Sequence, residues 1–239
     1  MSCIHIINDM ELIEIFLRKR ANEIQHMIKQ FSKLDNVNLT KIKYKTYDKI
    51  LIEFEGIRKE NILESICKSI FNFYKFSFLN SHLKDIIFDT YSIHALIGAL
   101  ISVDREKELN SLYFSVKNLR SISPESLIEF RHNNMQKNWN NLLELTRSLI
   151  KNLESKKELY ELISYFIASK DNSPRVTLTD SYPINLIVQG NLIEPVEFTS
   201  NNELNILTTV LSENPSHIVI KNQDILSTEL LEAFQALGQ

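Results

Sequence analysis

Two amphipathic segments between Ser123 and Lys170 constrain the fold more than any other part of the chain. Ser123-Pro124-Glu125 predicts a helix start, because serine caps, proline suits the first helical position and glutamate faces the positive end of the helix dipole. Apolar residues then recur at helical spacing, and a second such run follows a break at Glu154-Ser155. We therefore predict two neighbouring antiparallel helices, the first either continuous or kinked near 132–134. The two apolar stripes are Ile128, Met135, Trp139, Leu142, Leu145, Leu149 and Leu153, and Leu159, Leu162, Ile163, Phe166 and Ile167.

The first 57 residues predict a strand, a helix and a hairpin. Cys3–Ile7 is a short apolar run of strand length, and Met10–Leu34 has apolar residues at helical spacing. Three lysines, Lys41, Lys43 and Lys45, then alternate with Thr40, Ile42 and Tyr44, and a second alternating run, Ile50–Phe54, follows a turn at Thr46–Lys49. We expect Glu53 and Glu55 to lie opposite the lysines across this hairpin.

Further helices are expected in the middle of the chain, and a small α/β unit at its end. One helix is predicted to begin at Asn61, and a second to run from His82 to about Thr90. A third fills the apolar Ile93–Val103 segment, and a short fourth precedes Ser121. After residue 171 apolar residues recur at every second position, which predicts strands, with a hairpin turn at Gly190-Asn191. A capping box at Ser200-x-x-Glu203 then opens a helix, a buried strand follows at 218–220, and Ser227 caps a last helix.

These elements predict a helix-rich α+β fold. We expect an N-terminal strand-helix-hairpin unit over residues 1–57, a central helical bundle over 58–170 and a C-terminal α/β unit over 171–239. The strands of the two outer units either share one sheet or form separate sheets, since the sequence pattern fits both. Four glycines and five prolines in 239 residues favour helices and disfavour a glycine-rich nucleotide-binding fold.

Charge and cysteine content limit the classes of protein to which this chain can belong. A net charge of −3 argues against a dedicated binder of duplex nucleic acid. Cys3 and Cys67 lie in unlike contexts, which favours free thiols in a reducing cytoplasm over a disulfide. No secretory signal is visible, and the most apolar run, 93–103, is much shorter than the ~20 residues of a membrane span. We therefore expect a cytoplasmic protein without a membrane span.

The sequence carries no motif for a nucleotide, a metalloprotease or a hydrolase site. His82, Asp85 and Asp89 would share one face of the helix predicted there, a spacing that suits either a metal or an ordinary solvated face. Arg131, His132 and Trp139 are the candidates for a partner-binding patch, because tryptophan and arginine are enriched at binding hot spots. We expect no cofactor, and His94 to be a buried, hydrogen-bonded histidine. The basic runs 18–20 and 41–45 leave weak nucleic-acid binding as an alternative.

Three stretches in the C-terminal half resemble a known family. Ile122–Arg131 resembles the helix entry I-x-x-E-x-F-I-x-F-R of the YtxC-like family of sporulation proteins. Lys157–Phe166 is similar to its K-E-Y-x-E-F-I-x-L-L-x-Y-F stretch, and Leu207–Asn222 to its A-L-I-T-I-A-P-x-x-I-x-I-H-N ending. The resemblance covers Ile122 to Gln239. Upstream of it only the order of elements and the length agree.

The chain departs from that pattern at several positions. Leu127 and Leu162 stand where the family has phenylalanine, and Lys221 stands where it tends to have histidine. His132-Asn133-Asn134 replaces the expected basic and aromatic residues. The resemblance implies a cytoplasmic protein of spore-forming bacteria without an established activity. Our first expectation is thus a non-enzymatic interaction or accessory protein, with a metal-dependent enzyme or a weak nucleic-acid binder as alternatives.

Overall fold

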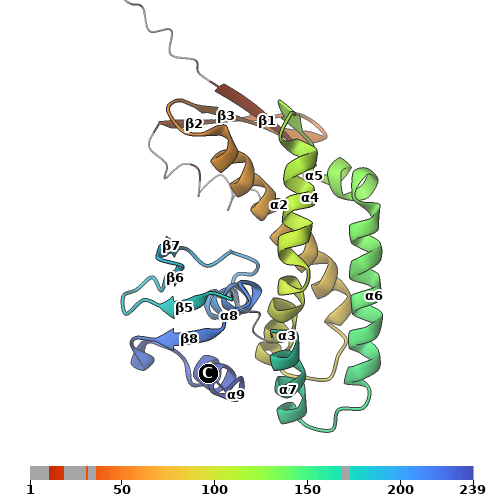
Figure 1. Ribbon diagram of the computed structural model, residues 1–239, viewed down its shortest axis with the longest axis vertical. Coiled ribbons are helices and arrows are strands. Elements are labelled where there is room, and N and C mark those ends of the chain that lie inside the picture. The colour runs from red at the N-terminus through yellow and green to blue at the C-terminus, as the bar shows by residue number, and fades with distance from the viewer. Residues whose placement is uncertain (1–10, 19–30, 32–35, 168–172, 239) are drawn as a thin grey trace, which may run out of the picture. The chain divides into compact units, whose positions relative to one another are not determined.

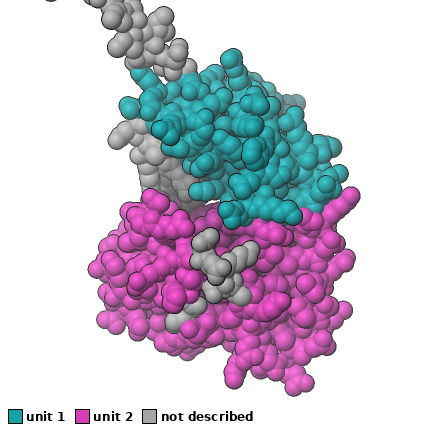
Figure 2. All heavy atoms as spheres, viewed as in Figure 1, with its two compact units in different colours: residues 1–71, 106–136 teal, residues 72–105, 137–239 magenta. Residues whose placement is uncertain are grey.

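The computed structural model describes residues 11–18, 31, 36–167 and 173–238 (Figure 1). These residues contain eight α-helices and two four-stranded mixed sheets, which confirms the helix-rich α+β fold class. The chain forms two compact units (Figure 2). Unit 1 comprises residues 1–71 and 106–136, and unit 2 comprises 72–105 and 137–239. Each unit is thus built from two separate stretches of chain, and the boundaries expected at 57/58 and 170/171 fall inside the units.

Unit 1 contains a sheet of order β2-β3-β1-β4. Its strands are β1 (Glu11–Arg18), β2 (Val37–Lys43), β3 (Tyr47–Phe54) and β4 (Ser121–Ile122). β1 pairs antiparallel with β3 and parallel with β4. Alternate residues of the two central strands point into the core and are almost fully buried, as a sheet with one covered face requires. They are Ile13, Ile15, Leu17, Ile50, Ile52 and Phe54.

The helix predicted from Met10 to Leu34 is wrong at its start, because Glu11–Arg18 form the strand β1. Ile13 and Leu17 lie four residues apart, and a spacing of four fits both a helix and a strand. Ile15 lies between them and is buried as well, so the period is two. The rest of the predicted helix, apart from Phe31, and the predicted strand Cys3–Ile7 lie outside the described residues.

The predicted hairpin is confirmed as β2 and β3, with a tighter turn than expected. The Tyr44 N–H donates to the Tyr47 carbonyl oxygen at 2.9 Å, so Tyr47–Lys49 belong to the strand. Because the turn is tighter, the two strands pair in a different register from the predicted one, and Glu53 lies opposite Asn38. The prediction that glutamates oppose the lysines is therefore wrong: Lys41 pairs with Asp48 at 3.0 Å.

Helical segments complete the described part of unit 1. Residues 59–71 belong to α2 (Lys59–Leu83), and residues 106–116 to α4 (Arg105–Val116). One turn, α5 (Pro124–Ser126), starts with the predicted cap, since the Ser126 N–H donates to Ser123 Oγ at 3.4 Å. A π-helical turn, η1 (Leu127–Arg131), follows and closes where the His132 N–H donates to the Leu127 carbonyl oxygen. α6 (Asn133–Ile150) begins directly after it, so the kinked alternative is confirmed.

Unit 2 is organised around a buried helix, α3 (Thr90–Ser102). All residues from Ser92 to Ser102 are buried, as expected for the 93–103 segment. α7 (Lys156–Phe166), α8 (Asn202–Ser212) and α9 (Thr228–Ala236) pack against it (Figure 1). The Glu203 carboxylate ties three of these helices together. It accepts hydrogen bonds from the Tyr91 hydroxyl at 2.6 Å and from the Ser227 N–H at 2.9 Å and hydroxyl at 2.6 Å.

The sheet of unit 2 has the order β7-β6-β5-β8. Its strands are β5 (Arg175–Leu178), β6 (Leu186–Val188), β7 (Asn191–Ile193) and β8 (His217–Ile220), and β5 and β8 run parallel. The hairpin turn uses Gln189 and Gly190, both with positive φ, one residue earlier than predicted. Among the described strands, those of 171–239 pair only with one another, so the two sheets are separate.

No helix within the described ranges has both the length and the apolar character needed to cross a membrane.

Candidate functional site

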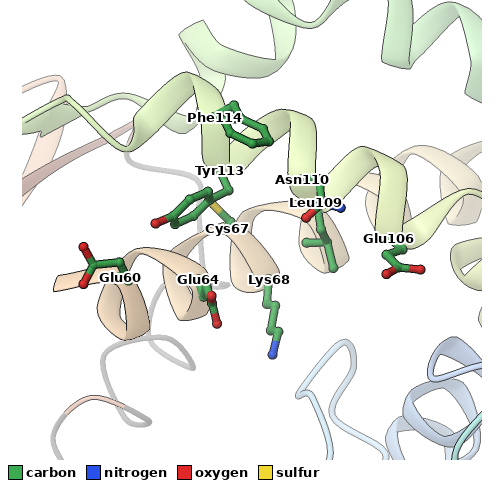
Figure 3. Close-up of a pocket in the computed structure, with 9 residues that line it drawn as sticks. All are labelled: Glu60, Glu64, Cys67, Lys68, Glu106, Leu109, Asn110, Tyr113 and Phe114. Carbon is green, nitrogen blue, oxygen red and sulfur yellow. The ribbon is translucent and has the colours of Figure 1, made fainter. Parts of the chain in front are cut away.

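Two helices of unit 1, α2 and α4, line a pocket of about 460 Å³ (Figure 3). Pockets that bury small ligands or short peptide segments have volumes of ~300–1,000 Å³, so this one is large enough to hold an occupant. Its lining comes from both helices: Glu60, Glu64, Cys67 and Lys68 from α2, and Glu106, Leu109, Asn110, Tyr113 and Phe114 from α4.

Helical periodicity places these side chains along two ridges. On α2, Glu60, Glu64 and Lys68 recur at steps of four, so they share one exposed face. On α4, Glu106, Asn110 and Tyr113 follow one another at steps of four and three, and in Figure 3 Tyr113 points from α4 toward α2. The opposite faces are anchored in the core of unit 1 by Ile62, Ile66, Ile70, Leu112 and Val116.

The pocket is acidic. Glu60, Glu64 and Glu106 carry three negative charges and Lys68 one positive charge, which leaves a formal charge of 1 − 3 = −2 over the described lining residues. Within the described part of the chain, none of these four side chains is in an ion pair. The three carboxylates are exposed to solvent.

The pKa values of two further groups are raised, mainly by burial and in part by these negative charges. Burial raises the pKa of the Cys67 thiol to about 12, and the charge of Glu64 adds to the effect. Desolvation also raises the pKa of Tyr113, with smaller contributions from Glu60, Glu64 and Cys67. Both groups stay protonated at neutral pH, so Cys67 is not a thiolate nucleophile.

Apolar surface lies beside the carboxylates. Leu109 and Tyr113 are partly exposed, and Phe114 is 65% exposed. The Phe114 ring meets Tyr113 edge to face at 6.1 Å, and Lys117 Nζ lies 4.7 Å from its centroid. An exposed aromatic ring at the edge of a pocket is typical of protein-binding sites, which are enriched in aromatic residues.

The structure does not place the three candidate metal ligands, His82, Asp85 and Asp89, on one helix. α2 ends at Leu83, so the helix predicted over 82–90 is wrong. His82 Nδ1 lies 2.7 Å from the Phe78 carbonyl oxygen, and Asp85 is exposed in the turn that follows α2. Asp89 caps α3 by accepting from the Ser92 N–H and pairs with Lys156 at 3.2 Å. No group of three histidine, cysteine or acidic residues that could hold a metal occurs among the described residues.

Asp89 is a charged structural cap. Burial would raise its pKa, but hydrogen bonds from Ser92 and the Lys156 ammonium outweigh burial and hold the pKa below its usual range. Its carboxylate is therefore ionised at neutral pH.

The partner-binding candidates differ sharply in exposure. Trp139 is 1% exposed and packs against Phe78, with ring centroids 5.7 Å apart, so it belongs to the core of unit 2. His132 is buried at the end of the π turn in unit 1, and burial together with Arg131 lowers its pKa. Arg131 is exposed. Of the three side chains, only Arg131 offers substantial surface to a partner.

Several of the remaining basic residues and His94 have partners inside the protein. The Arg18 guanidinium lies 3.7 Å from Glu129, and Lys41 pairs with Asp48, while Lys19 and Arg20 lie outside the described residues. His94 is buried, as expected, and its Nδ1 lies 3.0 Å from Thr208 Oγ1. Burial lowers the His94 pKa to about 4, so the ring is neutral.

The pocket was not predicted from the sequence. Its signal was present in each helix, as polar residues at steps of three and four opposite an apolar face. That signal also describes any solvated helix. Only the tertiary structure distinguishes it, because the lining comes from two separate helices, Lys59–Leu83 and Arg105–Val116, that meet at one pocket.

The chain matches no family model, no curated protein and no solved structure.

Proposed function

We propose that this chain is a non-enzymatic interaction protein that acts in the cytoplasm during sporulation, and that the pocket between α2 and α4 holds its protein partner. The observation that carries the proposal is the pocket itself, a 460 Å³ hollow that combines exposed carboxylates with an exposed aromatic ring. Mixed polar and aromatic linings of this kind are suited to recognition, because apolar contact supplies affinity and charge supplies specificity.

The chemistry of the lining favours binding over catalysis. A nucleophilic cysteine needs a lowered thiol pKa, whereas the pKa of Cys67 is raised to about 12. The three carboxylates are exposed, and the described lining residues include no histidine to act with them as a general base.

The role in sporulation rests on the resemblance of 122–239 to the YtxC-like family. It predicts that deleting the gene in the native host lowers the yield of heat-resistant spores, and that the wild-type gene restores it. An unchanged spore yield after deletion would remove the sporulation part of the proposal.

Site-specific photo-cross-linking tests the docking role. Asn110 is an exposed asparagine in the pocket, and Asn141 is an exposed asparagine on α6 outside the pocket, so they form a matched pair. A photoreactive amino acid at position 110 should give a discrete protein adduct in sporulating cells, and the same amino acid at 141 should not. Equal adducts from both positions, or none from 110, would contradict docking in the pocket.

A further inference from the structure

We propose that the pocket takes a lysine or arginine side chain next to an apolar residue, presented by an exposed segment of a protein partner. This inference rests on the proposed function and adds the chemistry of the occupant. It follows from three features of the described lining: its net negative charge, the way its acids are distributed and the apolar wall beside them.

The charge favours a cation. Three glutamates from two helices face a hollow that holds one lysine, and none of them has an ion-pair partner among the described residues. An anion would meet a formal charge of −2. A neutral apolar occupant would desolvate carboxylates without replacing their hydrogen bonds to water, which costs free energy.

The distribution of the acids favours a large organic cation over a metal ion. A bound metal ion needs several oxygen ligands at ~2.0–2.6 Å, and the described residues contain no group of acids close enough to supply them. A guanidinium or ammonium group on a long side chain needs only hydrogen-bonding distance to one or two carboxylates.

The apolar wall suits the stem of such a side chain and its neighbour. Lysine and arginine lay their methylene groups along apolar surface while the charged end reaches polar groups. Leu109, Tyr113 and Phe114 supply that surface on α4, next to the carboxylates. A free inorganic cation would leave this wall uncovered.

Two residues of opposite charge on α2 provide a test in both directions. Glu64→Gln removes one attraction, and Lys68→Gln removes a repulsion one helical turn further on. Glu144→Gln on α6 makes the same charge change as Glu64→Gln at an exposed helix position outside the pocket, and is the control. A residue that merely supports the fold would not tighten binding when it is neutralised.

The probe is the peptide acetyl-Gly-Leu-Arg-Leu-Gly-amide, compared with the same peptide carrying citrulline, which has the shape of arginine without its charge. Titration of the isotope-labelled full chain should shift the amide signals of pocket residues on α2 and α4 with the arginine peptide. Kd should rise by about two- to fivefold for Glu64→Gln, fall by a similar factor for Lys68→Gln and stay constant for Glu144→Gln. Equal binding of the citrulline peptide, or an equal effect of Glu144→Gln, would overturn the proposal.

Competition separates this inference from the proposed function. Excess arginine peptide should suppress the adduct formed from position 110, and the citrulline peptide should suppress it much less. An adduct that neither peptide suppresses would overturn the cationic occupant while leaving the docking role in place. Absence of any adduct would overturn both.

Discussion

Gly98 lets α3 and α8 approach each other closely. A Cβ added at this position would lie 2.8 Å from the Thr208 carbonyl oxygen and 2.9 Å from Leu211 Cβ. The first neighbour is backbone, which cannot turn away as the end of a flexible side chain would. Glycine is therefore needed here for space, in the middle of a helix where alanine is otherwise preferred.

We predict that Gly98→Ala destabilises the protein by about 1–2 kcal/mol. Overpacking costs ~1–3 kcal/mol, and the better helix propensity of alanine returns up to ~1 kcal/mol. The free energy of unfolding from urea titration measures the difference. Gly98→Val should cost more, because its side chain is larger. A variant Gly98→Ala as stable as the wild type would show that α3 and α8 do not approach this closely.

His94 makes stability depend on pH. Its pKa is about 4 in the folded protein, against 6.5 for the free side chain. As pH falls below 6.5 the unfolded chain binds the proton first, so the folded state loses stability between about pH 6.5 and 4. The loss approaches ~3 kcal/mol, at 1.36 kcal/mol for each pKa unit.

We predict that His94→Asn, which keeps a polar atom near the position of Nδ1, flattens this part of the pH profile. Urea unfolding of both proteins at about pH 7.5 and 4.5 gives the comparison, since the acidic groups titrate in both. Identical losses in the two proteins would show that His94 titrates normally in the folded state.

At the scale of elements, a forked ion pair joins the start of α4 to the end of α8. Arg105 Nη1 lies 2.8 Å from Glu213 Oε2, and Nη2 lies 2.7 Å from Oε1. Both side chains are under one fifth exposed, at 17% and 16%. Glu213 is the C-cap residue of α8, so the pair holds this helix end in position.

We predict a coupling free energy of about 1–3 kcal/mol between Arg105 and Glu213, from a double-mutant cycle with alanine. The Lys157–Glu161 pair on α7 is the matched control, because its side chains are 86% and 66% exposed and its coupling should be at most ~0.5 kcal/mol. Arg105→Lys should lose most of the coupling, since lysine cannot make the fork. Equal couplings for the two pairs would contradict the argument.

Elements with a single clear period were predicted well, and ambiguous ones were not. α7 and α9 follow their apolar stripes, α9 begins at the predicted cap Ser227, and α7 begins at the predicted break, where Ser155 is the N-cap. β1 was predicted as a helix because its buried residues include a pair spaced by four. The segment after His82 was predicted as a helix, yet Asp89 caps α3, and a capping residue needs extended backbone before the helix.

At the scale of the whole molecule, each compact unit draws on two separate stretches of chain. α3 lies in the first stretch of unit 2, and α7, α8 and α9, which cover it, lie in the second. The core of unit 2 therefore cannot close until the C-terminal part of the chain is present.

We predict that a chain ending at Lys170 does not fold unit 2, because it lacks α8 and α9 and exposes the apolar surface of α3. The fragment should be poorly soluble or bind a hydrophobic dye, and thermal unfolding should lose its cooperative transition. Removal of Gly238 and Gln239 alone is the control and should leave the transition unchanged. A soluble fragment with a cooperative transition would show that residues up to 170 form an independent core.

The sequence by itself determined the fold class, most helices, both hairpins and the buried state of His94. These features depend on residues close together in the chain, where spacing, caps and turn chemistry act directly. Tertiary structure alone decided that Glu11–Arg18 is a strand, that Trp139 packs against Phe78 and that α2 and α4 line an acidic pocket. Each of these outcomes depends on partners far away in the chain: β3 for β1, Phe78 for Trp139 and α4 for the glutamates of α2. Local pattern shows which face of an element is polar, and long-range packing decides which polar faces meet to form a site.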